Sequence, residues 1–207
     1  PWKSGYLQVL ILAFDTATDV ATVALAREGE VLGERASRAV RVLQDVEDLL
    51  AAAGLGANEV EGIAVGTGPG SYTGLRMGLV TARTLSFSLG VPVAGVSTLD
   101  ALAAGAPNAL PVIDGKRKEV FTLVAGEPSC LAAEQLEAEQ GRTYVGDGAV
   151  RFRTEIEGRG GLVPPDEDER HVPWARHHAA LASDFGAAEA AEPIYLRVPD
   201  AERALDR

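Results

Sequence analysis

The chain has 207 residues, of which 46% are hydrophobic and only 5% aromatic, so we expect a core built mainly from alanine, valine and leucine. Its formal net charge of −11 argues against binding nucleic acid unaided, because a protein that neutralises phosphates needs a basic face. A single cysteine leaves no disulfide framework and favours a cytoplasmic protein. No apolar run approaches the ~20 residues of a membrane span, and we expect residues 1–8 to be a tag remnant or a ragged start, not a signal peptide.

Hydrophobic patterning predicts a mixed sheet in the first half of the chain. Three strands joined by two tight turns are typical of an antiparallel meander, whereas two strands separated by a helix are parallel neighbours. The expected elements are strands at 9–14, 20–26 and 30–35, a helix over 42–53, a strand at 62–65, a helix that ends at Leu89, and a strand at 91–96.

A glycine-rich loop at 66–76 joins the strand at 62–65 to the helix that follows it. Helix N-termini present free backbone N–H groups, so Gly68, Gly70 and Ser71 are candidates for contact with an anion or a nucleotide. The loop is neither a Walker A loop nor a dinucleotide fingerprint, because it lacks a Gly-Lys-Ser/Thr ending and Ser71 replaces the third glycine. A sharp turn of the chain is the alternative.

Small side chains recur at every fourth residue of that helix, at Gly74, Gly78, Ala82 and Ser86. This spacing places them on one face. Each glycine inside a helix costs roughly 1 kcal/mol relative to alanine, so a compensating gain is expected. The stripe indicates either close approach of a partner helix or tight packing within the chain, and the pattern alone leaves both open.

The second half repeats the plan of the first. A strand at 110–114, a short loop and a strand at 119–125 follow the pattern of residues 11–26, with Asp114 in the place of Asp15. We therefore expect two related lobes, 9–103 and 104–207. The second lobe is predicted to continue with a helix around 131–139, a strand at 142–145, a loop at 164–169, a helix over 174–185 and a docked tail at 193–197.

Few residues suggest chemistry. Asp15 and Asp114 could hold Mg²⁺ and phosphates between two lobes, as in actin-like ATPases and sugar kinases, although turn capping is the alternative for an aspartate. The three histidines lack metal-binding spacing, since the neighbours His177 and His178 diverge by roughly 100° on a helix. Ser71 does not lie in a nucleophile elbow. We therefore expect no catalytic residue, no metal and no cofactor.

Several motifs resemble those of a known family. Residues 15–18, 66–76 and 95–102 are similar to signatures of the TsaB (YeaZ) family of bacterial tRNA threonylcarbamoyladenosine biosynthesis proteins. Residues 113–121, 146–149 and 193–199 resemble later signatures of this family in the same order. The resemblance implies an α/β, actin-like ATPase (ribonuclease H-like) fold of two related lobes, each with a mixed sheet flanked by helices.

The resemblance also implies a function. A member of this family is a non-catalytic partner of TsaD in forming N6-threonylcarbamoyladenosine at position 37, beside the anticodon, in tRNAs that read codons starting with adenine. It forms a heterodimer with TsaD, works with the ATPase TsaE, forms a homodimer when alone and contacts tRNA only through the complex. The alternatives are a self-sufficient ATP-dependent kinase or ATPase and a peptidase.

The resemblance implies a partner surface on the helix after the glycine loop and on the helix before it. The residues expected there are Gly74, Leu75, Gly78, Ala82, Ser86, Val42 and Val46. The chain departs from the family before the earlier helix, where a His-Ser-Glu stretch and a Leu-Leu-Pro stretch are usual. Residues 35–44 are shorter, contain no histidine and have Gln44 where the proline would be, which leaves the interface at this helix open.

Overall fold

A computed structural model describes residues 9–197. Its first sheet has five strands in the order β3-β2-β1-β4-β5. β1 pairs antiparallel with β2 and parallel with β4, and β5 continues the parallel part, so the predicted mixed sheet is confirmed. The strands span Leu10–Asp15 (β1), Ala21–Arg27 (β2), Glu30–Ser37 (β3), Gly62–Gly66 (β4) and Val93–Val96 (β5).

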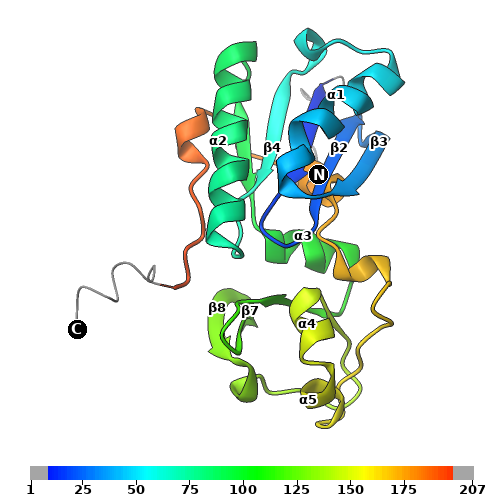
Figure 1. Ribbon diagram of the computed structural model, residues 1–207, viewed down its shortest axis with the longest axis vertical. Helices are drawn as coiled ribbons and strands as arrows, with labels where there is room; N and C mark the ends of the chain where they lie inside the picture. Colours follow the sequence, from blue (N-terminus) through cyan, green and yellow to red (C-terminus); the bar gives the residue numbers. More distant parts are fainter. Residues whose placement is uncertain (1–8, 198–207) are drawn as a thin grey trace, which may run out of the picture.

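Helices cover both faces of this sheet (Figure 1). α1 (Val42–Ala53) and α2 (Tyr72–Leu89) bury their apolar sides on one face, and both end at a glycine in the left-handed conformation, as the sequence predicts. α6 (Ala175–Leu181) packs on the other face, where alanines of the helix meet alanines of the strands. The central strand β1 is buried along its whole length, which explains its nearly continuous apolar sequence.

The second sheet has the order β8-β7-β6-β9 and repeats the order β3-β2-β1-β4 of the first. The hairpins at corresponding places turn through Glu28-Gly29 and Ala125-Gly126, and all four residues have positive φ. The predicted internal repeat is therefore confirmed. The strands span Leu110–Asp114 (β6), Glu119–Val124 (β7), Glu127–Ala132 (β8) and Tyr144–Val145 (β9).

The prediction of a helix around residues 131–139 is wrong. The Ala125-Gly126 turn sends the chain back along β7, so that Cys130 lies opposite Phe121 in β8. The helix predicted over 174–185 ends early, because Gly186 forms a bridge with Val93 of the first sheet. The remaining helices are α3 (Thr98–Gly105), α4 (Asp147–Arg151) and α5 (Arg153–Glu157), with single 3-10 turns at Ala39–Arg41, Ala57–Glu59, Ala133–Gln135, Glu169–His171 and Ala188–Ala190.

The last part of the chain returns to the first lobe. α6 and the residues after it belong to 104–207 in sequence but pack on the first sheet. The division at residues 103 and 104 thus stays a prediction as a domain boundary. The docked tail is confirmed, since Ile194 N donates to Thr67 O at 2.8 Å. The expectation for residues 1–8 and the end of the 193–199 match lie outside the described residues.

Candidate functional site between the two lobes

Asp15 ends β1 and is fully buried. Its carboxylate accepts hydrogen bonds from Ala17 N and Thr98 Oγ1, both at 2.6 Å, and His178 Nε2 of α6 lies 2.7 Å from Asp15 Oδ2. A Cβ at Gly66 would collide with this carboxylate, so the glycine makes room for it. Both oxygens of Asp15 are thus engaged by groups of the chain itself.

The charge state of Asp15 follows from these contacts. Burial alone would raise the pKa of Asp15, but His178, Thr98 and the Ala17 N–H together outweigh burial and hold this pKa below its usual value. The sequence pattern did not predict that His178 is the partner of Asp15. Ala175, His178, Ala179 and Ala182 are the buried residues of this segment, and their helical spacing on one face was the available signal.

The glycine loop is tied to the chain's own backbone. Ser71 caps α2, since its Oγ accepts a hydrogen bond from Gly74 N at 3.3 Å, and Ser71 N donates to Ala17 O at 2.7 Å. Gly68 O accepts from Thr98 N at 2.8 Å, and a Cβ at Gly70 would collide with Ala17. The close approaches that these glycines allow are therefore internal, and anion contact here stays a prediction.

The stripe of small residues on α2 also faces inward. A Cβ at Gly74 would collide with Thr16 O, and a Cβ at Gly78 would collide with Thr16 Oγ1. Thr16 Oγ1 in turn donates to Gly74 O at 2.7 Å. The stripe thus lets α2 approach the loop that follows β1, which is the internal-packing alternative.

The residues expected on the partner surface pack mainly inside the chain, and their contact with a partner stays a prediction. Six of them are buried in the chain's own fold, and the seventh, Ser86, is half-buried and donates to Val91 O at 2.6 Å. Their side chains are used for internal packing, so a partner would meet other faces of these helices. That the two helices pair with a partner stays a prediction. The six buried residues are Val42, Val46, Gly74, Leu75, Gly78 and Ala82.

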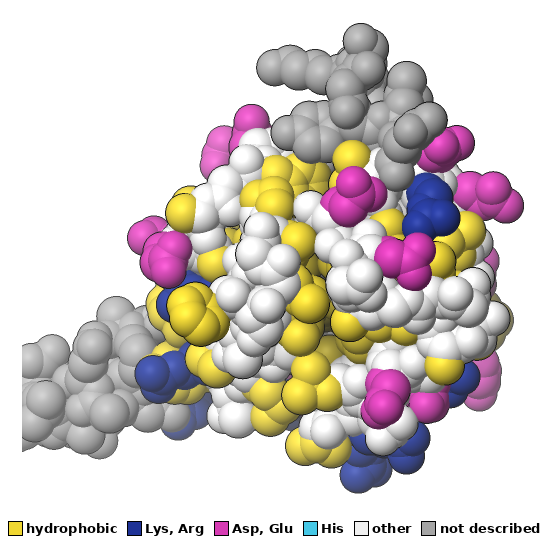
Figure 2. Space-filling view, turned by 90° about the horizontal axis from the view of Figure 1, so that it is seen from above, with side chains coloured by type: hydrophobic (Ala, Val, Ile, Leu, Met, Phe, Trp, Pro, Cys, Tyr) yellow, Lys and Arg dark blue, Asp and Glu magenta, His cyan; other side chains and the backbone are white. Residues whose placement is uncertain are grey.

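Large apolar side chains are exposed on the same two helices. Val40 and Leu43, just before and within α1, are 78% and 59% exposed, and Val80 and Phe87 of α2 are 59% and 91% exposed. We call these four residues the helix face. Figure 2 shows hydrophobic side chains on the upper end of the molecule, with charged side chains mainly around the margin.

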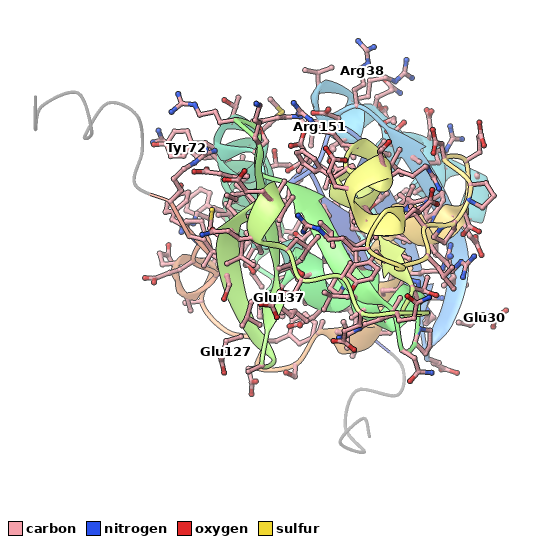
Figure 3. The ribbon with its side chains drawn as sticks, turned by 90° about the horizontal axis from the view of Figure 1, so that it is seen from below. Glu30, Arg38, Tyr72, Glu127, Glu137 and Arg151 are labelled. Carbon is pink, nitrogen blue, oxygen red and sulfur yellow. The ribbon has the colours of Figure 1, made fainter. Side chains whose placement is uncertain are left out.

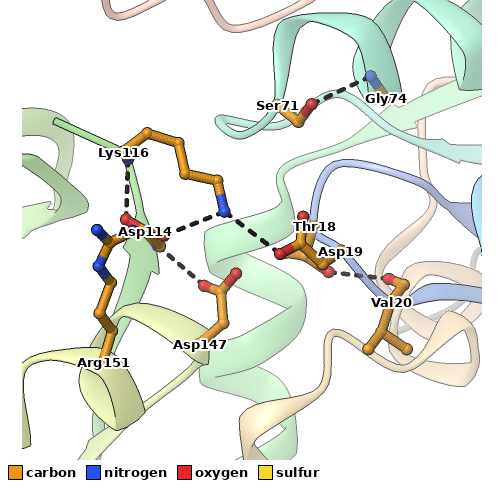
Figure 4. Close-up of polar contacts among 9 residues, drawn as sticks. All are labelled: Thr18, Asp19, Val20, Ser71, Gly74, Asp114, Lys116, Asp147 and Arg151. Carbon is orange, nitrogen blue, oxygen red and sulfur yellow. Dashed lines mark hydrogen bonds and ion pairs between the residues drawn. The ribbon is translucent and has the colours of Figure 1, made fainter.

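Asp114 is the centre of a charged cluster between the lobes (Figure 4). Asp114 Oδ2 lies 2.6 Å from Arg151 Nη1 and 3.1 Å from Lys116 Nζ, while Asp114 Oδ1 accepts from Lys116 N at 2.8 Å. Lys116 Nζ also lies 3.3 Å from Asp19 Oδ2 in the first lobe. Asp147 Oδ1 accepts from Asp114 N at 2.9 Å. Cations of the chain thus already neutralise the carboxylate that was a candidate for binding Mg²⁺.

The two aspartates of this cluster differ in acidity. Burial would raise the pKa of Asp114, but hydrogen bonds from Arg151 and Lys116 outweigh it and leave this pKa lowered. The pKa of Asp147 is raised, first by burial and then by the nearby charge of Asp114. Asp15 does not belong to this cluster, since its two oxygens are taken by Ala17, Thr98 and His178. The two candidate carboxylates thus have separate sets of partners.

The other histidines support the fold. His171 is buried, with Nδ1 accepting from Gly146 N at 3.0 Å and Nε2 at 3.2 Å from Pro164 O. His177 packs beside Gly105, and burial lowers its pKa. Among residues 9–197, no group of three or more histidine, cysteine or acidic side chains is placed to hold a metal ion. Within the same residues, no helix has the length and apolar character needed to cross a membrane.

Comparisons with known proteins place these features in a family. A family model described as TsaD, tRNA N6-adenosine threonylcarbamoyltransferase, matches residues 16–146. The tRNA threonylcarbamoyladenosine biosynthesis protein TsaB of Haemophilus influenzae is 39% identical over 121 residues, which are 54% of this chain and 51% of the relative. The chain thus spans about half the length of this curated relative.

Solved structures extend the likeness over more of the chain. The structure of YeaZ from Pseudomonas aeruginosa is 28% identical, with a TM-score of 0.76 over 91% of this chain and 100% of that chain. Component A of the (R)-2-hydroxyglutaryl-CoA dehydratase of Acidaminococcus fermentans is 10% identical, with a TM-score of 0.53 over 89% of this chain and 99% of that chain, and shows the fold alone. The predicted actin-like fold of two related lobes is confirmed.

Proposed function

Since this chain belongs to the family that the threonylcarbamoyltransferase model describes, and among its members to the TsaB (YeaZ) proteins, we propose that it takes part in forming threonylcarbamoyladenosine on tRNA. It serves as a non-catalytic partner of TsaD, which modifies adenosine 37 beside the anticodon of tRNAs that read codons starting with adenine. It works with the ATPase TsaE in the cytoplasm.

Occupied carboxylates support a non-catalytic role. His178 and Thr98 hold Asp15 inside the first lobe, and Arg151 and Lys116 hold Asp114 between the lobes. A carboxylate that binds Mg²⁺ and phosphate needs oxygen atoms free to face them. The alternative of a self-sufficient kinase or ATPase is therefore not favoured.

The helix face supports the role of a partner and is the observation on which the proposal depends. Burying a large apolar side chain is worth about 1.5–3 kcal/mol, and contiguous exposed apolar side chains mark interaction sites. Phe87 is 91% exposed, with Val80 two turns before it on α2. We assign the surface that pairs with TsaD to this face, and a second copy of the chain occupies it when TsaD is absent.

Size-exclusion chromatography with TsaD from the same organism tests the proposal. Wild type is expected to elute together with TsaD, whereas Phe87→Asp is expected to elute alone. Leu162→Asp is the matched control, because Leu162 is a 54%-exposed apolar residue of the second lobe, and this variant should still bind. Co-elution of Phe87→Asp with TsaD would reject the helix face. Failure of wild type to bind TsaD would reject the partner role itself.

A further inference from the structure

The turn between β6 and β7 combines charge with an unfavourable backbone. Lys116, Arg117 and Lys118, which we call the basic turn, are all exposed and have φ of 59°, 53° and 64°. Side chains with a Cβ disfavour this left-handed region, in which glycine and asparagine fit better. Three long cations in succession therefore keep a backbone that other residues would adopt at lower cost. Retained strain of this kind is concentrated at functional sites.

The docked tail connects the basic turn to a pair of tyrosines. Arg197 donates to Gly115 O at 2.6 Å and pairs with Glu119 at 2.7 Å, so the tail is held against the strand ends on both sides of the turn. Two residues earlier, the ring of Tyr195 lies 5.5 Å from the ring of Tyr72, measured between centroids. The tail therefore runs from the tyrosine pair to the residues on either side of the basic turn.

The tyrosine pair has the composition of a stacking platform. Both rings are exposed. The guanidinium of Arg76 lies 5.2 Å from the centroid of the Tyr72 ring and donates to Tyr72 Oη at 3.0 Å. Aromatic rings and arginine planes are the groups on which unpaired bases stack.

Charge is distributed unevenly over this acidic protein. Seen from below, Tyr72, Arg151 and Arg38 lie in the upper part of the view, whereas Glu30, Glu127 and Glu137 lie below them (Figure 3). Lys118 makes no ion pair with any residue in the range 9–197. Around the basic turn, Lys116 and Arg151 pair with Asp114, and Arg197 pairs with Glu119.

We propose that the basic turn and the tyrosine pair form a contact for single-stranded RNA. The cations meet phosphates, and Tyr195 with Tyr72 stacks on unpaired bases. Paired bases in an A-form helix are stacked on one another and do not offer their faces, so the RNA is a loop or an end. The inference rests on the proposed function, because the RNA in question is the tRNA bound to the complex. The net charge of −11 keeps the affinity of the chain alone low, and binding to TsaD raises the effective concentration.

Fluorescence anisotropy with a labelled 12-nucleotide single-stranded RNA tests this contact, using the complex with TsaD at several salt concentrations. Lys118→Gly is the first variant, because glycine accepts the φ of 64° without strain. It is expected to raise the melting temperature, weaken RNA binding about threefold and reduce the salt dependence by about one phosphate contact. Lys118→Glu is expected to weaken binding about tenfold, and Tyr195→Ala to weaken it more than Tyr195→Phe.

Arg27→Glu is the matched control for charge reversal. Arg27 pairs through its backbone with Glu30, which lies at the lower right in Figure 3, away from Tyr72 and Arg151, so its effect should be less than about twofold. Equal weakening by Arg27→Glu and Lys118→Glu would overturn the proposal. Displacement of the labelled RNA by polyglutamate as effectively as by unlabelled RNA would also overturn it, because the surface would then be assigned to an acidic protein. Co-elution with TsaD shows whether each variant still forms the complex. If the complex is intact and the RNA affinity is unchanged, the RNA contact is rejected but the proposed function is not.

Discussion

Asp15 and His178 are both fully buried and face each other across the first lobe at 2.7 Å. Removal of one partner of such a buried pair leaves the other without its contact. The same carboxylate accepts hydrogen bonds from Thr98, at the start of α3, and from Ala17, in the loop after β1. At the scale of the residue, Asp15 thus organises the loops that surround it.

We therefore expect His178→Leu to destabilise the protein by about 3–5 kcal/mol, because the Asp15 carboxylate would remain buried without its partner. Urea unfolding followed by circular dichroism measures the change. His177→Leu is the matched control on the same helix, since His178 lies 2.7 Å from the Asp15 carboxylate, whereas His177 pairs with no carboxylate within residues 9–197, and it should cost less than about 1 kcal/mol. Equal losses in the two variants would contradict the role of the Asp15–His178 pair.

Stability should also fall in acid through Asp15. Its pKa in the folded protein is lowered from 3.8, so the unfolded chain takes up this proton first. The contribution is present above pH 3.8 and is lost as the pH falls from that value through the folded pKa. In Asp15→Asn the slope of unfolding free energy against pH below 3.8 should be smaller than in wild type. An unchanged slope would contradict the lowered pKa of Asp15.

The elements of the first lobe follow from local patterns. Continuous apolar runs predicted the buried strands, and the predicted helix ends at residue 53 and at Leu89 agree with α1 and α2. The second lobe was harder to predict, because β8 reads Glu-Pro-Ser-Cys-Leu-Ala and forms a strand through pairing with β7 instead of through its own propensity. α4 and α5 have five residues each, too few for a helical period to appear.

At the candidate site, too, local sequence patterns predicted some features, whereas contacts between distant residues were not predicted. The sequence predicts that Asp15 and Asp114 end equivalent strands, since that depends on an internal repeat. It does not predict that His178, more than 160 residues away, contacts Asp15. It also left the stripe on α2 open between a partner and internal packing, because the spacing of small residues does not say what lies opposite. Thr16, which lies opposite, comes from a loop that periodicity does not place.

The close packing of α2 against Thr16 leads to a prediction about the stability of α2. Gly78→Ala should destabilise the protein by about 1–3 kcal/mol, because the added methyl group collides with Thr16 Oγ1. Thr16→Ala removes that oxygen, so Gly78→Ala should cost less when introduced into the Thr16→Ala protein. A double-mutant cycle of denaturant unfolding measures the coupling. Additive effects of the two changes would show that Gly78 and Thr16 do not interact.

The basic turn makes a prediction of opposite sign. Lys118→Gly should stabilise the protein by about 1 kcal/mol, because glycine relieves a left-handed backbone that costs roughly 1–2 kcal/mol for other residues, less the entropy that glycine adds to the unfolded chain. Thermal unfolding measures this gain. Loss of stability in Lys118→Gly would mean that the lysine side chain supports the fold.

At the scale of the whole molecule, two lobes of the same strand order surround a charged junction, in which Lys116 and Arg151 pair with Asp114. Apolar side chains instead gather on the outer faces of α1 and α2. The molecule thus resembles an actin-like ATPase in its architecture while its exposed features are those of a binding partner. Its proposed contribution is a surface that TsaD recognises.

Formation of threonylcarbamoyladenosine on tRNA by purified TsaD and TsaE, with and without this chain, tests that claim most directly. We expect modification to require the chain, to be supported equally by wild type and by Leu162→Asp, and to be lost with Phe87→Asp at limiting concentration. Full activity of Phe87→Asp, or modification of tRNA by this chain in the absence of TsaD, would contradict the account.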